Sequence, residues 1–205
     1  MESNARNEFP TTGMMQRVTK SVGIAVQAAI VGFRQAYSQG NSFDSIMGYI
    51  DTLTNIPNRR AYERDKSSYC KGYALVMIDI DNFKLINDTK GHSFGDIILK
   101  RLAAILSDAA GGDGRAYRIG GDEFVAIIPA RNVGKFCNEV KMRMRREDSF
   151  TISQGMTALV DDEDAGDSAL AIADTALYHV KKNGKNGVCF FDFPQVAQLA
   201  AAGAE

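Results

Sequence analysis

The sequence predicts an α/β domain in which a mixed sheet of about five strands is flanked by helices. Two observations predict this fold class. Short apolar runs rich in strand-forming residues alternate with longer segments whose apolar residues recur at helical spacing. Two of the strand candidates are separated by a short glycine-rich turn, which predicts a hairpin inside a sheet whose other connections are helical.

The first strand is predicted over residues 75–78, an apolar run that is followed directly by Asp79. A helix is predicted over residues 93–110, because its apolar residues fall on one helical stripe. Ser93 is expected to cap the start of this helix, and the glycines that begin at Gly111 are expected to end it.

The remaining elements follow in the order strand, strand, helix, strand, helix, strand. Strands over 115–119 and 123–129 form the hairpin. The later elements are predicted as a helix over 131–146, a strand within 150–160, a helix over 167–182 and a strand over 188–191.

The domain itself is expected over residues 48–193, between an N-terminal extension over 1–47 and a tail over 194–205. Within the extension, residues 14–38 are predicted to form a helix, because small apolar residues recur there at heptad spacing. Two interpretations of this helix stay open. It is a dimerising or signalling helix, or it packs on its own domain.

Bulk composition gives no argument for a nucleic-acid or membrane partner. The chain has 205 residues and a net charge of −1, so a local site must attract any anionic ligand. Its three cysteines lack zinc spacing, which favours reduced thiols and a cytoplasmic location. The longest apolar stretch near the N-terminus, residues 22–33, is far shorter than the roughly 20 residues that span a bilayer.

Acidic side chains occur at the predicted end of the first strand and in the hairpin turn. Asp79 and Asp81 follow the strand, whereas Asp122 and Glu123 occupy the turn. Pairing of the two segments would bring the carboxylates together, where they repel each other unless a cation is present. Oxygen ligands with no His or Cys nearby suit Mg²⁺ or Mn²⁺.

Gly120 and Gly121 precede these turn acids. Glycine permits positive φ and a close approach of a ligand to the backbone. Gly-Gly-Asp is also a good hairpin turn with no further function, so the tripeptide alone does not identify a site.

Six motifs in order resemble those of the GGDEF-domain diguanylate cyclases, and they cover residues 51–191. They are Asp51-Thr-Leu-Thr-Asn-Ile-Pro-Asn-Arg-Arg60, Asp79-Ile-Asp-Asn-Phe-Lys-Leu-Ile-Asn-Asp88, Gly91-His-Ser-Phe-Gly-Asp96, Arg118-Ile-Gly-Gly-Asp-Glu-Phe124, Ser153-Gln-Gly155, and Ala176-Leu-Tyr-His-Val-Lys181 with Asn183-Gly-Lys-Asn186. The resemblance implies a palm-like fold shared with nucleotidyl cyclases and polymerases. It also implies an enzyme that condenses two GTP into cyclic di-GMP and two pyrophosphates across a homodimer.

The resemblance assigns the acidic residues to metal binding and catalysis. Asp79 and Asp122 are expected to bind Mg²⁺ through their carboxylates, and Ile80 through its carbonyl group. Glu123 is expected to assist the metal and to help deprotonate the 3′-hydroxyl group.

The resemblance also implies a set of substrate-binding residues. Asn87 and Asp96 are expected to bind the guanine edge, which adenine cannot match. The remaining expected substrate contacts are Phe83 and Lys84 at a helix start, Gly120 and Gly121 in the turn, His92, and the lysines Lys181 and Lys185. Lys185 stands where the family usually has Arg, which keeps the charge but loses the planar fork, so we expect a weaker grip on phosphate.

One family feature is missing. Many members carry an RxxD product-binding site just before the signature, but the aligned residues here run from Gly111 to Gly114 and contain no Arg. We therefore expect no inhibition by cyclic di-GMP through this stretch.

Two alternatives to an active cyclase remain. One is a catalytically silent GGDEF domain that serves as a GTP-binding or protein-interaction module. The other is a synthase of a different cyclic dinucleotide. The presence of Asp79, Asp122 and Glu123 argues against the first, and Asp96 argues against the second.

Overall fold

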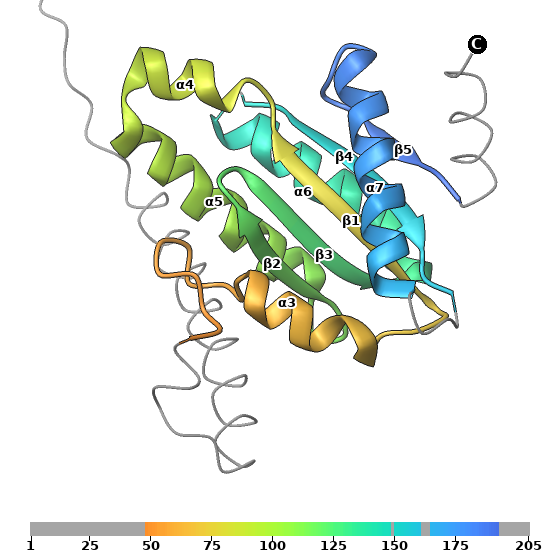
Figure 1. Cartoon of the computed structure of the whole chain (residues 1–205). Coiled ribbons are helices and arrows are strands. Elements are labelled where there is room, and N and C mark those ends of the chain that lie inside the picture. Colours follow the sequence, from red (N-terminus) through yellow and green to blue (C-terminus); the bar gives the residue numbers. More distant parts are fainter. Residues whose placement is uncertain (1–47, 149, 161–164, 193–205) are drawn as a thin grey trace, which may run out of the picture.

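The computed structural model describes residues 48–148, 150–160 and 165–192. Within these residues, five strands form a mixed sheet in the order β2-β3-β1-β4-β5, with helices against both faces (Figure 1). The predicted fold class is therefore confirmed. In chain order the helices and strands are α3 (Arg59–Asp65), β1 (Tyr73–Ile80), α4 (Phe83–Lys90), α5 (His92–Ala110), β2 (Arg115–Gly120), β3 (Glu123–Pro129), α6 (Val133–Asp148), β4 (Ile152–Ala158), α7 (Ala165–Lys182) and β5 (Val188–Phe190).

β1 lies in the middle of the sheet and is buried along nearly its whole length. Because side chains alternate across a strand, Val76 and Ile78 face a core formed with α5 and α6. Leu75 and Met77 face a second core formed with α3 and α7. Burial on both faces explains why this strand is a continuous apolar run in the sequence.

The pairing of β1 with β3 brings the two acidic segments together. The strands are antiparallel, and Asp79 of β1 lies directly opposite Glu123 of β3. β3 also pairs with β2 across the predicted hairpin, with a register shift between Arg118 and Gly120. The hairpin turn is thereby held at the end of the sheet where β1 finishes.

α7 packs very closely on β4 at Gly155. A Cβ atom at this position would overlap the backbone nitrogen of Leu177 and the carbonyl oxygen of Ala173. Leu177 is buried against the sheet, and Lys181 follows it by one helical turn. Residues four apart share a helix face, so this contact directs Lys181 towards the sheet.

Some elements differ from the sequence predictions. α3 was not predicted, because its short sequence has no clear apolar period; the side chain of Asn58 caps its first turn. α5 begins at His92 with Gly91 as the N-cap residue and no side-chain cap, so the cap predicted at Ser93 is wrong. The helix predicted over residues 14–38 lies outside the described residues. No helix in the described ranges combines the length and apolarity needed to cross a membrane.

Replacing Gly155 by Ala should destabilise the fold, because the new Cβ would push α7 away from β4. We expect the free energy of unfolding to fall by about 1–3 kcal/mol, as for other overpacked sites. Chemical denaturation followed by circular dichroism measures the change. Gly134→Ala is the matched control, because a Cβ at this α6 position has no atom within 4 Å. The control should be neutral or stabilising by up to about 1 kcal/mol. Equal stability of the two variants would contradict the packing argument.

Candidate functional site

Three carboxylates gather where β1 ends and the β2–β3 hairpin turns. Asp79 and Glu123 are directly opposite on antiparallel strands, which places their Cβ atoms about 4.5–5.5 Å apart on one face of the sheet. Asp122 lies in the turn between β2 and β3. Asp79 is only 6% exposed, whereas Glu123 is exposed. The site therefore has one buried acid and two that can reach a ligand.

The surroundings raise the pKa of Asp79 to about 6. Burial is the main cause, because it disfavours the charged form. The negative charges of Asp122 and Glu123 add to the effect, while Lys181 opposes it.

Lys181 supplies the opposing charge. Its Nζ atom lies 2.8 Å from Oδ2 of Asp79, and the close packing of α7 on β4 aims the side chain there. A cation therefore touches the most buried of the three clustered acids, Asp79. This contact brings together two residues that were assigned from separate motifs.

The donors at this point are hard oxygen atoms, namely the carboxylates of Asp79, Asp122 and Glu123, which suit Mg²⁺ or Mn²⁺. Across the described ranges, however, no three acidic, histidine or cysteine side chains already form a closed ligand set. The chemistry of the site fits a divalent cation that also takes oxygen atoms from a bound phosphate. Ile80, whose carbonyl group was predicted as a further ligand, lies at the end of β1.

The hairpin turn is shaped by its two glycines in different ways. A Cβ at Gly120 would come within 3.0 Å of Oε2 of Glu123, so glycine leaves room for that carboxylate. A Cβ at Gly121 would meet no atom within 4 Å, so the backbone there is open to a ligand. Neither glycine adopts a positive φ. The turn therefore does not use the positive φ values that glycine permits. The open space at Gly121 does support a close approach of a ligand to the backbone.

Arg118 fixes the position of the turn. Its Nε and Nη2 atoms donate to the carbonyl oxygen of Gly121 at 3.0 and 2.7 Å, and its Nη1 atom lies 2.9 Å from Oδ1 of Asp51. Burial would raise the pKa of Asp51, but hydrogen bonds from Thr54 and Arg118 outweigh it and lower the pKa. Asp51 of the first motif therefore helps to fix the signature turn, because it pairs with the arginine that binds the turn.

A second corner of the site forms where β1 meets the loop before β5. Lys185 donates from Nζ to Oδ1 of Asn82 at 2.5 Å. Asn82, Lys185 and Asn186 all have left-handed backbones, with φ of 60°, 61° and 49°. Such strain in residues other than glycine occurs mainly where a site needs a fixed shape.

Asp81 stabilises this corner through hydrogen bonds. It is 4% exposed and accepts hydrogen bonds from the hydroxyl groups of Thr151 and Ser153, both at 2.6 Å, and from the backbone N–H of Asn186 at 2.9 Å. Asp81 therefore ties β1, β4 and the Lys185 loop together.

α4 begins beside this corner. Phe83 and Lys84 form its first turn, and Asn82 stands at its N-cap without a side-chain hydrogen bond to the helix. The free N–H groups of a first turn suit a phosphate. Phe83 is partly buried against the core, whereas Lys84 is exposed.

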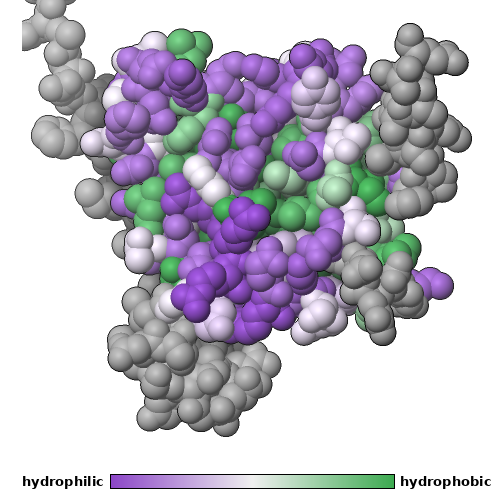
Figure 2. Space-filling model, viewed as in Figure 1, coloured by the Kyte–Doolittle hydropathy of each residue, from purple (hydrophilic) through white to green (hydrophobic). Residues whose placement is uncertain are grey.

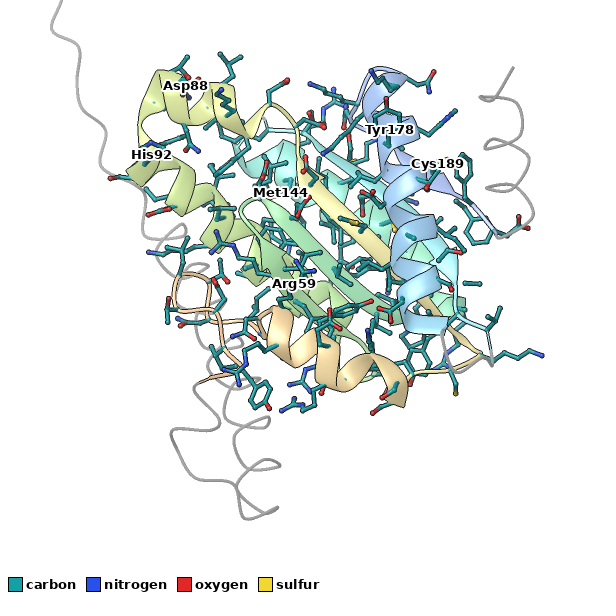
Figure 3. The ribbon with its side chains drawn as sticks, in the orientation of Figure 1. Arg59, Asp88, His92, Met144, Tyr178 and Cys189 are labelled. Carbon is teal, nitrogen blue, oxygen red and sulfur yellow. The ribbon has the colours of Figure 1, made fainter. Side chains whose placement is uncertain are left out.

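The α4–α5 corner contains the predicted guanine-binding residues. Oδ1 of Asn87 is buried and has no hydrogen-bond partner, and a Cβ at Gly95 would overlap this oxygen. The neighbouring Asp96 is partly buried. Figure 3 places His92 at the outer corner of the two helices, where it is exposed. Figure 2 shows mainly hydrophilic residues over α4 and α3, with hydrophobic residues visible between them over the sheet.

The last residue of the stretch that aligns with the missing product-binding motif, Gly114, is tightly packed. A Cβ at Gly114 would lie 2.6 Å from the carbonyl oxygen of Ala110 and 2.9 Å from Cδ1 of Ile128. The aspartate of an RxxD motif therefore has no space at this position.

Three supporting residues were quoted in motifs but given no role, namely Asp51, Arg118 and Gly95. Asp81 was expected to join the acidic cluster, but the structure ties its carboxylate to Thr151, Ser153 and Asn186 instead. For Asp81 the sequence held a hint, because an acid directly after a buried strand needs hydrogen-bond partners. The partners themselves come from distant segments and have no local pattern.

Comparison with known proteins identifies the family. A family model described as the GGDEF domain of diguanylate cyclases matches residues 48–187. The chain belongs to this GGDEF-domain family.

The GGDEF relatives include proteins named as diguanylate cyclases. DgcZ of Escherichia coli strain K12 is 30% identical over 164 residues, which cover 72% of this chain and 55% of DgcZ. VdcA of Vibrio cholerae is 33% identical over 155 residues, which cover 67% of this chain and 45% of VdcA. The chain thus spans about half the length of these curated relatives.

Solved GGDEF structures share the palm-like fold. The GGDEF domain of DgcB from Caulobacter crescentus, in complex with cyclic di-GMP, has a TM-score of 0.63 and 30% identity over 70% of this chain and 93% of its own. A microbial GGDEF domain described with cyclic di-GMP has a TM-score of 0.64 and 27% identity over 70% of this chain and 99% of its own.

Replacing Asp79 by Asn should stabilise the metal-free protein at high pH. The folded pKa of about 6 lies above the ordinary value of 3.8, so the folded state binds the proton more tightly. The stability of the native chain therefore falls as pH rises between these values. Asn has no charge to bury, so we expect a gain of about 1–3 kcal/mol near pH 8 that disappears below about pH 4.

Chemical denaturation in EDTA-containing buffer at both pH values measures this difference. Asp88→Asn, which changes an exposed acid on α4 (Figure 3), is the control and should stay within about 0.5 kcal/mol of the native chain. An Asp79→Asn protein that is less stable than the native chain near pH 8 would refute the assigned environment.

Proposed function

We propose that the chain is a diguanylate cyclase that converts two GTP into cyclic di-GMP and two pyrophosphates. The observation that carries the proposal is the gathering of Asp79, Asp122 and Glu123 at one end of the sheet with the ammonium group of Lys181. This arrangement provides oxygen ligands, a base and a phosphate-binding cation together. The GGDEF family match supports the same reaction.

The reaction consists of two equivalent phosphoryl transfers. In each, the 3′-oxygen of one nucleotide attacks the α-phosphorus of the other. The bond from the α-phosphorus to the bridging oxygen breaks, and pyrophosphate leaves with its electron pair. The hydroxyl proton passes to the carboxylate of Glu123, which is exposed beside the turn and can reach a substrate.

The residues fit Mg²⁺ or Mn²⁺, which the carboxylates of Asp79, Asp122 and Glu123 and the carbonyl group of Ile80 would hold. When bound, such an ion supplies positive charge against the triphosphate. The protein residues must keep the three acids close together and Glu123 free to accept a proton. The in-register pairing of β1 with β3 supports both requirements.

The triphosphate is bound by the strained corner beside β1. Lys181 and Lys185 supply charge, and the first turn of α4 at Phe83 and Lys84 supplies backbone N–H groups. On substrate binding, Lys181 exchanges Asp79 for a phosphate oxygen. The open backbone of Gly121 and the space above Gly120 accommodate the nucleotide at the turn.

Asn87 and Asp96 select guanine. The unpartnered oxygen of Asn87 and the Asp96 carboxylate accept hydrogen bonds from the N–H groups of the guanine edge. Adenine lacks these donors on the matching edge. His92, the first residue of α5, adds a further contact to the nucleotide from the α4–α5 corner.

Each chain holds one GTP, so a homodimer joins the two nucleotides. The protein acts in the cytoplasm, where the described thiols of Cys70, Cys137 and Cys189 remain free. Cyclic di-GMP leaves without inhibiting through residues 111–114, because Gly114 has no room for a product-binding side chain.

Incubation of the native chain with GTP and Mg²⁺ should yield cyclic di-GMP, which chromatography separates and quantifies. Glu123→Gln should reduce the rate at least about a hundredfold, because an amide cannot accept the proton. Its affinity for GTP should change little. Glu139→Gln on α6, far from the turn, is the control and should keep the native rate. A native chain that binds GTP but forms no product would favour the catalytically silent GGDEF domain.

Asp96→Ala should weaken binding of GTP by about tenfold to a hundredfold, as expected for hydrogen bonds to a charged acceptor. Binding of ATP should change much less, so the preference for GTP falls. Titration calorimetry with both nucleotides measures the two affinities. Asp88→Ala, which removes an exposed acid from the adjoining helix α4, should leave the GTP affinity unchanged. An equal loss for GTP and ATP would remove Asp96 from base recognition.

A further inference from the structure

A groove of about 390 Å³ lies on the β2 side of the catalytic turn. Asn58, Arg59 and Arg60 at the start of α3 form one wall, while Arg118, Gly120 and Gly121 form the other. Figure 3 shows Arg59 at this boundary, between α3 and the strands of the hairpin. The proposed nucleotide contacts use Gly120 and Gly121 of this groove but leave Arg59 and Arg60 without a role.

The lining of the groove is positively charged. It contains three guanidinium groups and one carboxylate, that of Asp51. Asp51 is already paired with Arg118, so Arg59 and Arg60 set the net charge. Both are exposed, and the Arg60 guanidinium lies over the ring of Tyr49 at 5.4 Å. Exposed guanidinium groups recognise phosphate through paired hydrogen bonds.

The catalytic turn therefore stands between two cationic groups on opposite sides. Lys181 and Lys185 approach from the β1 and β4 side, and Arg59 and Arg60 approach from the β2 side. The order of the sheet keeps them apart, because β3 and β1 lie between β2 and β4. Between the two groups, the open backbone of Gly121 leaves room for a ligand.

We propose that the Arg59–Arg60 groove binds a phosphate group of the second nucleotide, which is the GTP held by the partner chain. This inference rests on the proposed function, in which a homodimer brings the two nucleotides together. The lysines and the first turn of α4 bind the first triphosphate. A second phosphate that approaches the same turn requires positive charge on the other side, and Arg59 and Arg60 supply it.

The test uses an Arg59→Gln/Arg60→Gln double variant of the full chain. Its affinity for a single GTP, measured with a non-reactive analogue, should stay within about twofold of the native value. Its rate of cyclic di-GMP formation should fall at least about tenfold, because charge-assisted contacts to the second phosphate are lost. Arg59→Lys/Arg60→Lys keeps the charge and should recover part of the rate.

The matched control is Arg145→Gln/Arg146→Gln, which removes an adjacent pair of exposed arginines from the end of α6. It should keep the native rate and affinity. Circular dichroism and sedimentation of all variants check the fold and the oligomeric state. If the Arg59→Gln/Arg60→Gln variant unfolds, the Arg59→Lys/Arg60→Lys variant decides the test. Its rate of cyclic di-GMP formation must then lie below that of the native chain.

Three outcomes overturn the inference. In the first, the Arg59→Gln/Arg60→Gln variant keeps the native rate. In the second, its affinity for a single GTP falls in proportion to its rate. In the third, its rate falls only because it no longer dimerises. A native chain that forms no dinucleotide in the same assay refutes the proposed function instead, and the inference falls with it.

Discussion

Two carboxylates that lie directly opposite each other on adjacent strands repel, and the protein buries one of this pair, Asp79, while Glu123 stays exposed. The antiparallel register that builds the core between β1 and β3 also sets Asp79 against Glu123. Burial strengthens the repulsion, because charges interact more strongly away from water. The site therefore depends on a cation, and α7 provides one in Lys181. The missing side chain at Gly155 is what allows α7 to approach closely enough to do so.

Asp79 and Asp81 are two residues apart in sequence but have opposite environments. Asp81 accepts hydrogen bonds from two segments, at Thr151 and Ser153 and at Asn186, and joins both to the end of β1. Asp79 depends on one ion pair and has a raised pKa. Environment thus gives two identical side chains different properties, because hydrogen bonds hold Asp81 whereas Asp79 is held by an ion pair and has a raised pKa. The same contrast appears in the turn, where Arg118 immobilises the backbone while Glu123 stays exposed.

Most of the fold could be predicted from the sequence, because the helices and strands with a clear apolar periodicity were predicted within a few residues of their observed bounds. β1 and the hairpin were visible as an apolar run and a Gly-Gly-Asp turn, and α5 as a long amphipathic stripe. α3 was missed because seven residues are too few to show a period. The candidate site residues came from motifs, but their contacts did not. Two contacts could not be predicted. One is the ion pair of Lys181 with Asp79, which are distant in the sequence, and the other is the hydrogen bond from Arg118 to the carbonyl oxygen of Gly121, which depends on the folded turn.

Gly114 has a consequence for how the activity can be regulated by design. Its position is enclosed by the carbonyl oxygen of Ala110 and the side chain of Ile128. An aspartate introduced there would have to displace the end of α5 from β3 before it could meet any ligand. Point mutation at residues 111 and 114 is therefore a poor route to feedback control. An engineer who wants that property must transplant the whole connection between α5 and β2, together with the contacts beneath it.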